Sequence, residues 1–288
     1  MPMKDLCLFV SDLHGKVNRY EKLFKYIEEQ VPGAVFLGGD LLPASILHSF
    51  RAGANMPDFV IDFLALKFRE LRERMQDNYP HIFIILGNDD PRIKEAEILT
   101  TEEEGLWHYI HGKIHNYFGT IVMGYSFVPP TPFLLKDWEK FDMEETVRPG
   151  CLHPNDGFLT TDHVQDKSST IMQDLDVLSE EQEFGNAICV FHSPPYNCCL
   201  DKAALDGVKV EGKLIDPHVG SIAIKEFIAQ KKPRITLHGH IHEASRLTGS
   251  WKEKIYDTIV MSAAYEGPEL AVVRFTISNP EDAQRIIL

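Results

Sequence analysis

Val35-Phe36-Leu37-Gly38-Gly39-Asp40 sets the architecture that we expect for this chain. The apolar residues at its start favour a strand that is covered on both faces. Gly38 and Gly39 allow a sharp turn and a close approach of other groups. Asp40 would then lie at the carboxyl end of the strand, where open α/β sheets bind their ligands. We interpret Asp40 as a carboxylate that two metal ions share.

A strand–helix–strand unit surrounds Asp40. Residues 6–10 form a short apolar run, and Asp12 and His14 follow it. Residues from about 17 to 30 then carry apolar side chains at helical spacing. Because such a connection makes its two strands parallel, Asp12 and Asp40 are expected at the same edge of one sheet.

Three more apolar runs end in the same way, with a polar side chain shortly after the strand. These runs and the residues that follow them are 82–86 with Asn88, 187–191 with His192, and 235–237 with His240 and His242. One such residue is weak evidence, but the recurrence at five strand ends indicates a metal site. Oxygen and imidazole donors without a thiolate suit manganese, with iron or zinc as alternatives. The sequence thus predicts two divalent ions and seven ligands: Asp12, His14, Asp40, Asn88, His192, His240 and His242.

The other elements are predicted from periodicity and turn residues. We expect helices over residues 57–78, 169–178 and 217–231, a hairpin of strands 114–117 and 120–125, and tail strands 256–261, 271–277 and 285–288. Residues 41–55 are read as irregular. Since no repeat or linker divides the chain, we expect one domain over residues 1–288, with a proline-rich insert at about 128–167. The aromatic residues of the insert suit a lid over the site and the anchors of a surface loop equally well: Phe127, Phe133, Trp138, Phe141 and Phe158.

The charge of the chain limits its partners. It has 43 acidic and 29 basic residues, a net charge of −14, and its basic residues are scattered. Because no basic stripe is available for a phosphate backbone, a nucleic-acid partner is disfavoured. The five cysteines form no disulfide framework, and we see no signal peptide and no apolar run of membrane length. We therefore predict a cytoplasmic protein with reduced thiols and no membrane partner; the oligomeric state is not indicated.

Taken in order, the motifs resemble the signature of the calcineurin-like metallophosphoesterases over nearly the whole chain. They are Asp12-x-His14, Gly39-Asp40, Gly87-Asn88, His192 and Gly239-His240-x-His242. The segment that begins at His192 is similar to a bacterial or archaeal branch of small phosphoesterases. The resemblance implies an α/β fold, a four-layer α-β-β-α sandwich of two mixed sheets. It also implies that Asp12, His14 and His242 hold one ion, that Asn88, His192 and His240 hold the other, and that Asp40 bridges them.

The predicted function is a dinuclear metal-dependent phosphoesterase that hydrolyses a small phosphodiester or phosphomonoester. Two cations about 3.5–4 Å apart lower the pKa of a bridging water, and the resulting hydroxide attacks phosphorus in line. The same cations neutralise the charge that develops in the transition state. The candidate catalytic residues are Asp40, Asn88 and Asp89.

Asp89 departs from the pattern of the family, which usually has a histidine here that is thought to protonate the leaving group. A carboxyl group near two cations should have a lowered pKa and be a poor general acid. Three interpretations stay open: Asp89 delivers the proton through water, His153 or His163 replaces it, or the substrates have good leaving groups. We adopt the last as our hypothesis.

Two other functions are compatible with the sequence. One is a nuclease or nucleotide phosphodiesterase, and the acidic composition argues against the nuclease. The other is a non-catalytic scaffold that retains the metal-binding fold, and Asp89 alone favours it. Near the motifs, Arg92 is expected to be exposed rather than bound to phosphate, and His238 to be packed beside the ligands rather than to be one.

Overall fold

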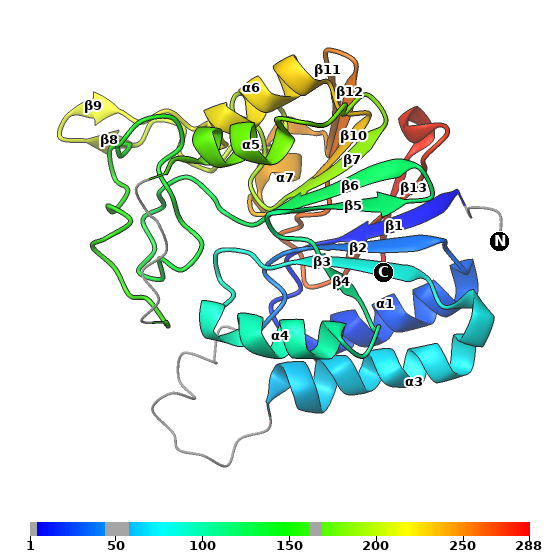
Figure 1. Ribbon diagram of the computed structural model, residues 1–288. Helices are drawn as coiled ribbons and strands as arrows, with labels where there is room; N and C mark the ends of the chain where they lie inside the picture. Colours follow the sequence, from blue (N-terminus) through cyan, green and yellow to red (C-terminus); the bar gives the residue numbers. More distant parts are fainter. Residues whose placement is uncertain (1–4, 44–57, 162–168) are drawn as a thin grey trace.

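Two six-stranded sheets form the centre of the protein, seen in a computed structural model that describes residues 5–43, 58–161 and 169–288 (Figure 1). The first sheet has the strand order β14 (Gln284–Ile287), β13 (Ala271–Thr276), β1 (Leu6–Val10), β2 (Ala34–Gly38), β3 (His81–Ile85) and β4 (His108–Tyr109). The second has the order β11 (Lys252–Ile255), β12 (Thr258–Ser262), β10 (Ile235–His238), β7 (Ala187–Phe191), β6 (Thr120–Tyr125) and β5 (Lys113–Tyr117). A separate small hairpin joins β8 (Lys209–Val210) to β9 (Lys213–Leu214).

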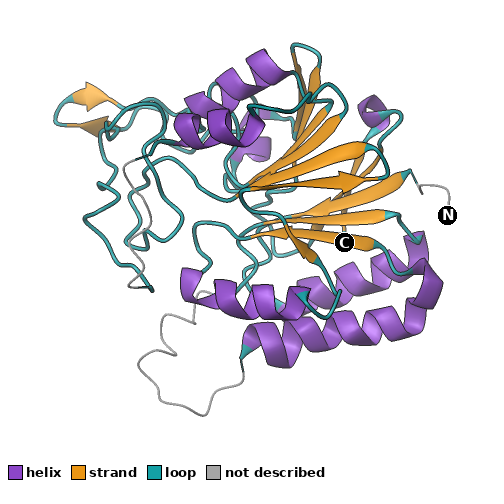
Figure 2. Cartoon of the chain, in the orientation of Figure 1, coloured by secondary structure: helices purple, strands orange, loops and turns teal. Residues whose placement is uncertain are grey.

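Helices cover the outer faces of the two sheets (Figure 2). The helices beside the first sheet are α1 (Val17–Gln30), α3 (Leu66–Met75) and α4 (Glu95–Glu102). Those beside the second are α5 (Ile171–Ser179) and α6 (Ile222–Lys231), and α7 (Ala244–Thr248) is a short helix after β10. Both sheets are mixed, since β1 is parallel to β2 but antiparallel to β13, and β6 is parallel to β7 but antiparallel to β5. The predicted α-β-β-α sandwich is thus confirmed.

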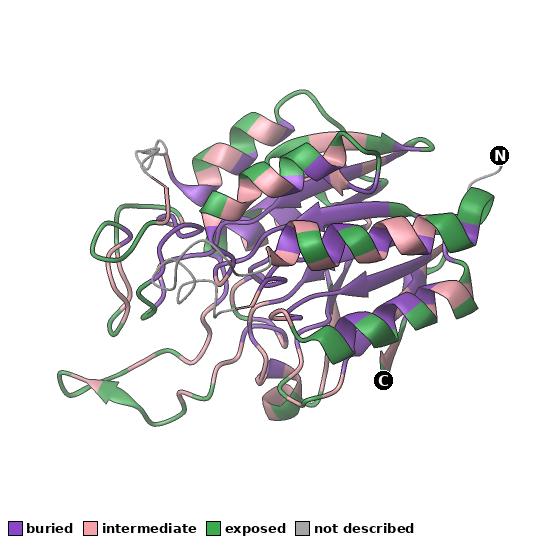
Figure 3. Ribbon diagram, turned by 90° about the horizontal axis from the view of Figure 1, so that it is seen from below, coloured by how far each residue is buried: buried purple, intermediate pink, exposed green. Residues whose placement is uncertain are grey.

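Strand β1 shows why its sequence is apolar at nearly every position. Cys7 and Phe9 belong to the core between the two sheets. Leu8 and Val10 point the other way and pack in the core that includes Leu23 of α1. Successive side chains of a strand alternate between faces, so a strand with both faces covered needs a continuous apolar run. Figure 3 shows the same principle in the helices, whose buried residues face the sheets and whose exposed residues face outward.

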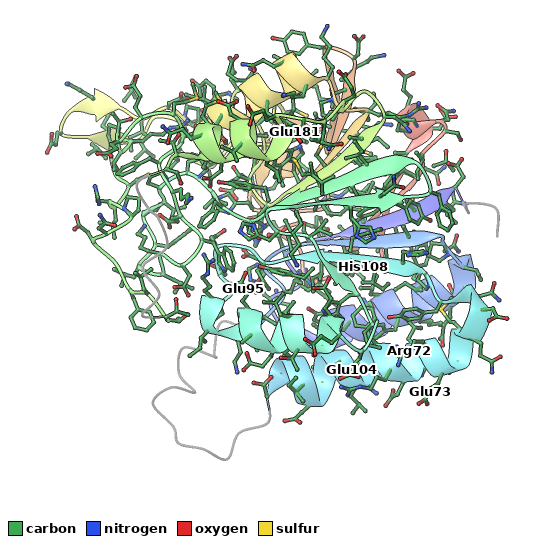
Figure 4. The ribbon with its side chains drawn as sticks, in the orientation of Figure 1. Arg72, Glu73, Glu95, Glu104, His108 and Glu181 are labelled. Atoms are coloured by element: carbon green, nitrogen blue, oxygen red, sulfur yellow. The ribbon has the colours of Figure 1, made fainter. Side chains whose placement is uncertain are left out.

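The expected helix over residues 57–78 is only partly regular. A π-helical segment, Phe59–Ala65, precedes α3, and a short 3₁₀ turn, Gln76–Asn78, follows it. Asp58 caps the start, since its carboxylate accepts from the backbone N–H groups of Val60 and Ile61. Most of the predicted irregular segment, and also Pro57, lies outside the described residues. At the far side of the helical layer, Arg72 donates to the backbone carbonyl of Glu104, and both are labelled in Figure 4.

The helix predicted over residues 217–231 begins five residues later, at Ile222. Ser221 is the N-cap, because its hydroxyl accepts from the backbone N–H of Ile224. The carboxylate of Asp142, from the insert, accepts from Ser221 Oγ at 2.5 Å and from the N–H of Ile222 at 2.6 Å. The apolar pattern had indicated a start at Pro217. The polar cap formed by Ser221 and Asp142 instead sets the N-terminus of α6 at Ile222.

The remaining predicted strands and the two remaining predicted helices, 17–30 and 169–178, match the structure within two residues at each end. Helix α4, the two-residue strand β4, helix α7 and strand β11 were not predicted. All five cysteines are free thiols. Within the described ranges, none of the helices combines the length and the apolar character of a membrane span.

Candidate metal centre

The candidate ligands meet at one edge of the sandwich, where the parallel strands of both sheets reach their carboxyl ends. β1, β2 and β3 of the first sheet lead to Asp12 and His14, to Asp40, and to Asn88 and Asp89. β7 and β10 of the second sheet lead to His192 and to His240 and His242. The insert and the β8–β9 hairpin extend beyond this same edge, on the left of Figure 1. The structure thus brings together residues that are far apart along the chain.

The backbone at this edge is unusual. Four of the candidate ligands have a positive φ angle: Asp12 at 58°, His14 at 48°, Asp40 at 53° and His240 at 75°. Residues other than glycine rarely adopt this left-handed conformation, which costs of the order of 1 kcal/mol or more per residue. Such outliers cluster at functional sites, where the surrounding structure enforces them.

Two glycines let the strand ends approach each other. A Cβ atom on Gly87 would lie 2.4 Å from Oδ1 of Asp40, and one on Gly39 would lie 2.6 Å from Nδ1 of His192. Both positions therefore exclude any side chain. The Gly-Asp and Gly-Asn pairs of the sequence reflect this packing.

The first group consists of Asp12, His14 and His242, whose ligand atoms all lie within 4.8 Å of one another. Nε2 of His242 is 3.2 Å from Oδ1 of Asp12, and Nε2 of His14 is 3.3 Å from Nε2 of His242. Burial by itself would raise the pKa of Asp12, but the contact with His242 and the nearby histidine charges hold that pKa well below its usual range. The group therefore presents an ionised carboxylate and two imidazoles to one point.

The second group consists of Asp40, His192 and His240, again within 4.8 Å. Nδ1 of His192 is 2.8 Å from the carbonyl of Gly38, which can only accept, so this nitrogen carries a proton. The other nitrogen, Nε2, is 3.0 Å from Oδ1 of Asn88 and 3.3 Å from Oδ2 of Asp40. Three acceptor atoms thus face one another: Nε2 of His192, Oδ1 of Asn88 and Oδ2 of Asp40.

Without a cation, that arrangement needs an extra proton. Burial alone would lower the pKa of His192, but the carboxylate of Asp40 overcomes this effect and raises the pKa to about 10. Nδ1 of His240 is buried and has no hydrogen-bond partner within the described structure. Converging acceptors and an unpaired imidazole nitrogen are what a divalent cation would satisfy, so the donor set fits a metal centre.

Asp40 lies between the two groups. Its ligand atom is also within 4.8 Å of those of His14 and Asp89, a third combination that could hold a cation. Its Oδ1 accepts from the backbone N–H of Asp89 at 2.8 Å. Asp40 thus lies within reach of ligand atoms from both groups.

Asp89 faces the centre, since one of its carboxylate oxygens is 3.7 Å from Nδ1 of His14. The other accepts from the side-chain amide of Asn88 at 2.9 Å, which turns the amide oxygen of Asn88 toward His192. In the chain alone, burial and then the charge of Asp40 raise the pKa of Asp89 to about 7. Bound cations would oppose this effect. Of the alternative acids, His153 packs on the ring of Phe141 and His163 lies outside the described residues.

Two residues that support the centre were missed in the sequence. Asp90 is fully buried, and its carboxylate accepts from the N–H groups of Leu41, Leu42 and Gly87, so it joins the turns after β2 and β3. Arg19 is buried in α1 and donates to the carbonyl of Asp12 at 2.6 Å. The repeated acid in Asn88-Asp89-Asp90 was a signal for the first, and no pattern indicated the second.

The insert is anchored on the third motif. The indole of Trp138 is fully buried and donates to the carbonyl of Asp90 at 2.8 Å. The prediction that Arg92 is exposed is wrong. Its guanidinium stacks 4.5 Å from the ring centroid of Trp138, which leaves the side chain partly buried. Phe127 and Phe141 are also buried, whereas Phe133 and Phe158 are about half exposed. The insert aromatics therefore divide into anchors and exposed residues.

His238 is packed beside the ligands, as expected. Its Nδ1 donates to the carbonyl of Ser193 at 2.9 Å, and its Nε2 is 2.7 Å from the hydroxyl of Thr236. Burial lowers its pKa to about 4, so the ring is neutral. With both nitrogens engaged, His238 joins the loop after β7 to β10.

Comparison with known proteins agrees with this geometry. The model of the family described as calcineurin-like phosphoesterase matches residues 7–244. The solved structure of TT1561 from Thermus thermophilus is similar, with a TM-score of 0.58 and 16% identity over 99% of each chain. A phosphopantetheinyl hydrolase from Mycobacterium tuberculosis has a TM-score of 0.51 and 12% identity, covering 92% of this chain and 91% of its own. At these identities the two structures show a shared fold. Among curated proteins, none matches the chain.

Proposed function

Since the chain belongs to the calcineurin-like phosphoesterase family and is a hydrolase acting on phosphate esters, we propose that it hydrolyses a small phosphodiester or phosphomonoester with two divalent metal ions. The observation that carries this proposal is the pair of ligand groups, Asp12–His14–His242 and Asp40–His192–His240, with Asp40 between them. A nuclease or a nucleotide phosphodiesterase is the alternative within the family, and the charge of −14 argues against an extended polyanionic substrate.

The proposed ligands are the seven residues predicted from the sequence. Asp12, His14 and His242 would hold the first ion. Asn88, His192 and His240 would hold the second, with Asp40 shared. Oxygen and neutral imidazole donors favour manganese, and iron or zinc would also suit them.

When bound, the two cations would supply Lewis acidity for an attacking water and neutralise charge on the phosphoryl oxygens. The residues of the chain orient that chemistry. The Gly38 carbonyl fixes the His192 tautomer so that Nε2 faces inward, and the N–H of Asp89 fixes one oxygen of Asp40. Asn88 directs its amide oxygen toward His192 because its nitrogen donates to Asp89. In-line attack of water on phosphorus stays part of the proposal.

The assay that tests this function uses bis(p-nitrophenyl) phosphate with added Mn²⁺. We expect turnover by the wild type and a loss of about 100-fold or more in Asp40→Asn, because the shared carboxylate is then missing. The matched control is Asp77→Asn, an exposed acid of the 3₁₀ turn Gln76–Asn78, which should behave as wild type.

The outcomes separate the alternatives. Absence of turnover by the wild type with manganese, iron or zinc would favour the non-catalytic scaffold. Equal activity of Asp40→Asn and the wild type would refute the metal role of Asp40. Hydrolysis of single-stranded DNA or of cyclic nucleotides, compared with small esters, distinguishes the nuclease and the nucleotide phosphodiesterase.

We also propose that residues 1–288 act as one metallophosphoesterase domain, with an insert at about 128–167, in the cytoplasm. The buried contact between Trp138 and Asp90 supports treating the insert as part of the catalytic unit.

A further inference from the structure

A pocket of about 270 Å³ adjoins the candidate metal centre. Three segments form it: the insert, the stretch between β7 and α6 that includes the β8–β9 hairpin, and the loop after β10. His240, one of the proposed metal ligands, is part of its lining. A molecule bound in the pocket would therefore lie next to the reacting phosphate.

The walls of this pocket are mainly apolar. Four prolines from the insert line it: Pro129, Pro130, Pro132 and Pro149. Proline has no backbone N–H and a fixed φ, so this wall is rigid and poor in donors. The stretch between β7 and α6 adds Leu205, Ile215 and Val219 to the lining. Such a surface favours a hydrocarbon and offers few partners to a polar ligand.

The charged side chains that line the pocket make hydrogen bonds within the protein. The guanidinium of Arg148 donates to the carbonyls of His218 and Gly220 and lies 5.1 Å from the ring centroid of Tyr196. Asp216 accepts from the hydroxyl of Tyr196 and from the N–H of His218.

Thr131 and Glu243 are engaged in the same way. The hydroxyl of Thr131 donates to Glu139, and the carboxylate of Glu243 accepts from the N–H of Ala204. Among the described residues that line the pocket, Nδ1 of His240 stands out as a buried polar atom without a partner, and it belongs to the metal centre. The pocket therefore combines a mainly apolar lining with a metal-ligand residue, His240.

We propose that this pocket binds the apolar organic group of the substrate, so that the natural substrate is a phosphate ester of an aromatic or branched aliphatic alcohol. The inference rests on the proposed function of the adjoining site. An apolar cavity of about 150 Å³ holds one benzene ring, so the present volume suits a group of about ten carbon atoms. The proline wall offers carbonyl acceptors but no N–H donors, so the acceptor atoms of a sugar or a nucleobase would lose their hydrogen bonds to water there, which is costly. A second phosphate group would be repelled by the negatively charged carboxylates of Asp216 and Glu243, which line the pocket.

The test measures binding and turnover separately on the full chain loaded with Mn²⁺. Binding uses 1-naphthylmethylphosphonate and methylphosphonate, which are not hydrolysed, by titration calorimetry. Turnover uses 1-naphthyl phosphate and glycerol 2-phosphate. The variants are Phe133→Ser, from the insert, and Leu205→Ser, from the stretch between β7 and α6, and the control is Leu134→Ser. Leu134 neighbours Phe133, is 68% exposed against 53% for Phe133, and is not among the pocket residues.

We expect the naphthyl phosphonate to bind at least about tenfold tighter than methylphosphonate, as the burial of an aromatic group predicts. The two pocket variants should weaken naphthyl binding and raise KM for 1-naphthyl phosphate by about three- to tenfold, with little change for the small ligands. Leu134→Ser should match the wild type. Thermal unfolding verifies that each variant is folded, and the partly exposed positions of Phe133 and Leu205 make large losses of stability unexpected.

Failure of the pocket and failure of the catalytic proposal give different results. Hydrolysis of both esters with equal preference, or variants that weaken both phosphonates alike, would overturn the pocket while leaving the activity intact. Selective, pocket-dependent naphthyl binding without turnover of any ester would support the pocket and overturn the catalytic proposal.

Discussion

At the scale of single residues, the most informative feature is the left-handed backbone at Asp12, His14, Asp40 and His240. The sequence located these residues, because an acid or a histidine after a buried strand is a recognisable pattern. It did not predict their conformation, since side chains other than glycine rarely adopt a positive φ. The contacts that enforce it are long-range, such as the hydrogen bond from His14 N to the carbonyl of Asp40. The sequence was thus sufficient to locate the candidate ligands, whereas their strained backbone conformation became known from the structure.

Asp89 leads to a prediction about leaving groups. Since cations should keep its carboxyl ionised, we expect the wild type to hydrolyse an aryl phosphate much faster than an alkyl phosphate. In Asp89→His, an imidazole could protonate the alkoxide, so the alkyl rate should rise about tenfold or more relative to the aryl rate. Steady-state kinetics on p-nitrophenyl phosphate and ethyl phosphate measure this ratio.

The control for that comparison is Asp89→Asn, which removes the charge without adding an acid. An alkyl-to-aryl ratio that stays the same in Asp89→His would refute the hypothesis. A ratio that rises equally in both variants would assign the effect to the lost charge instead.

His111 leads to a prediction about pH. Its Nδ1 accepts from the N–H of Ser126, and its ring packs 5.0 Å from the ring of Trp138. Burial, followed by the nearby charge of Arg92, lowers the pKa of His111 to about 3. In the unfolded chain its pKa is about 6.5. Between these values the unfolded state binds the extra proton, so folding stability is full above about pH 6.5 and falls as the pH decreases toward 3.

The measurement compares the wild type with His111→Gln, which stays neutral and keeps an acceptor. Urea unfolding of the metal-free chains from pH 7 to pH 4 should give a difference in unfolding free energy that changes by about 1.4 kcal/mol per pH unit below pH 6. Parallel curves for the two proteins would show that His111 does not titrate between the folded and unfolded states.

At the scale of elements, long apolar runs were predictable and short elements were not. The five buried strands that carry the candidate ligands stand out because both of their faces are covered, so nearly every residue is apolar. Strand β4 has only two residues, and α7 has five, too few to show a period. The start of α6 was placed too early because the apolar residue Val219 continues its pattern, although that side chain lines the pocket beside the metal centre.

The hydrogen bonds of Asp142 at the start of α6 connect the insert to the helical layer beside the second sheet. In Asp142→Ala, the N–H of Ile222 and the hydroxyl of Ser221 lose their acceptor. We therefore expect the free energy of unfolding, measured by urea unfolding, to fall by about 1–2 kcal/mol. The segment around Asp142 should also become more exposed to proteases and to hydrogen exchange, because its tie to α6 is removed.

Asp58→Ala is the matched control, because Asp58 caps the helical segment that begins at Phe59, beside the first sheet. This variant should lower the free energy of unfolding by about 1 kcal/mol without increasing hydrogen exchange in the segment around Asp142. If both variants increase exchange in that segment to the same extent, the loss of stability and not the loss of the tie is the cause.

At the scale of the whole molecule, the resemblance of the motifs to a known family implied two mixed sheets with outer helices, but the sequence did not predict the full strand order. A strand–helix–strand unit determines its own handedness, so the parallel pairing of β1 with β2 was predictable. The placement of β13 beside β1 and of β12 beside β10 was not, because pairing between distant strands leaves no local pattern. The described part of the insert, residues 128–161, has little regular structure, and contacts such as that of the Trp138 side chain with the carbonyl of Asp90 hold it in place.

The metal centre joins strands of both sheets, so metal binding should stabilise the whole fold. At an Mn²⁺ concentration about 100 times the Kd, the gain is about 2.7 kcal/mol, which for a protein of this size is a rise in Tm of several degrees. Differential scanning fluorimetry with and without Mn²⁺ measures it. Asp40→Asn should lose most of the shift, whereas Asp77→Asn should keep it; no shift in the wild type would refute the site.

The antiparallel pairing of β1 with β13 has a consequence for biogenesis. Its register joins Leu6 to Thr276, so during synthesis β1 cannot pair with this neighbour until translation has reached β13. At 5–20 residues per second, that delay is of the order of tens of seconds. During it, the edge of β1 that faces β13 has unpaired backbone N–H and C=O groups, which can pair with other chains and promote aggregation. A stop codon before β13 should therefore yield an insoluble product rather than a slightly shortened enzyme.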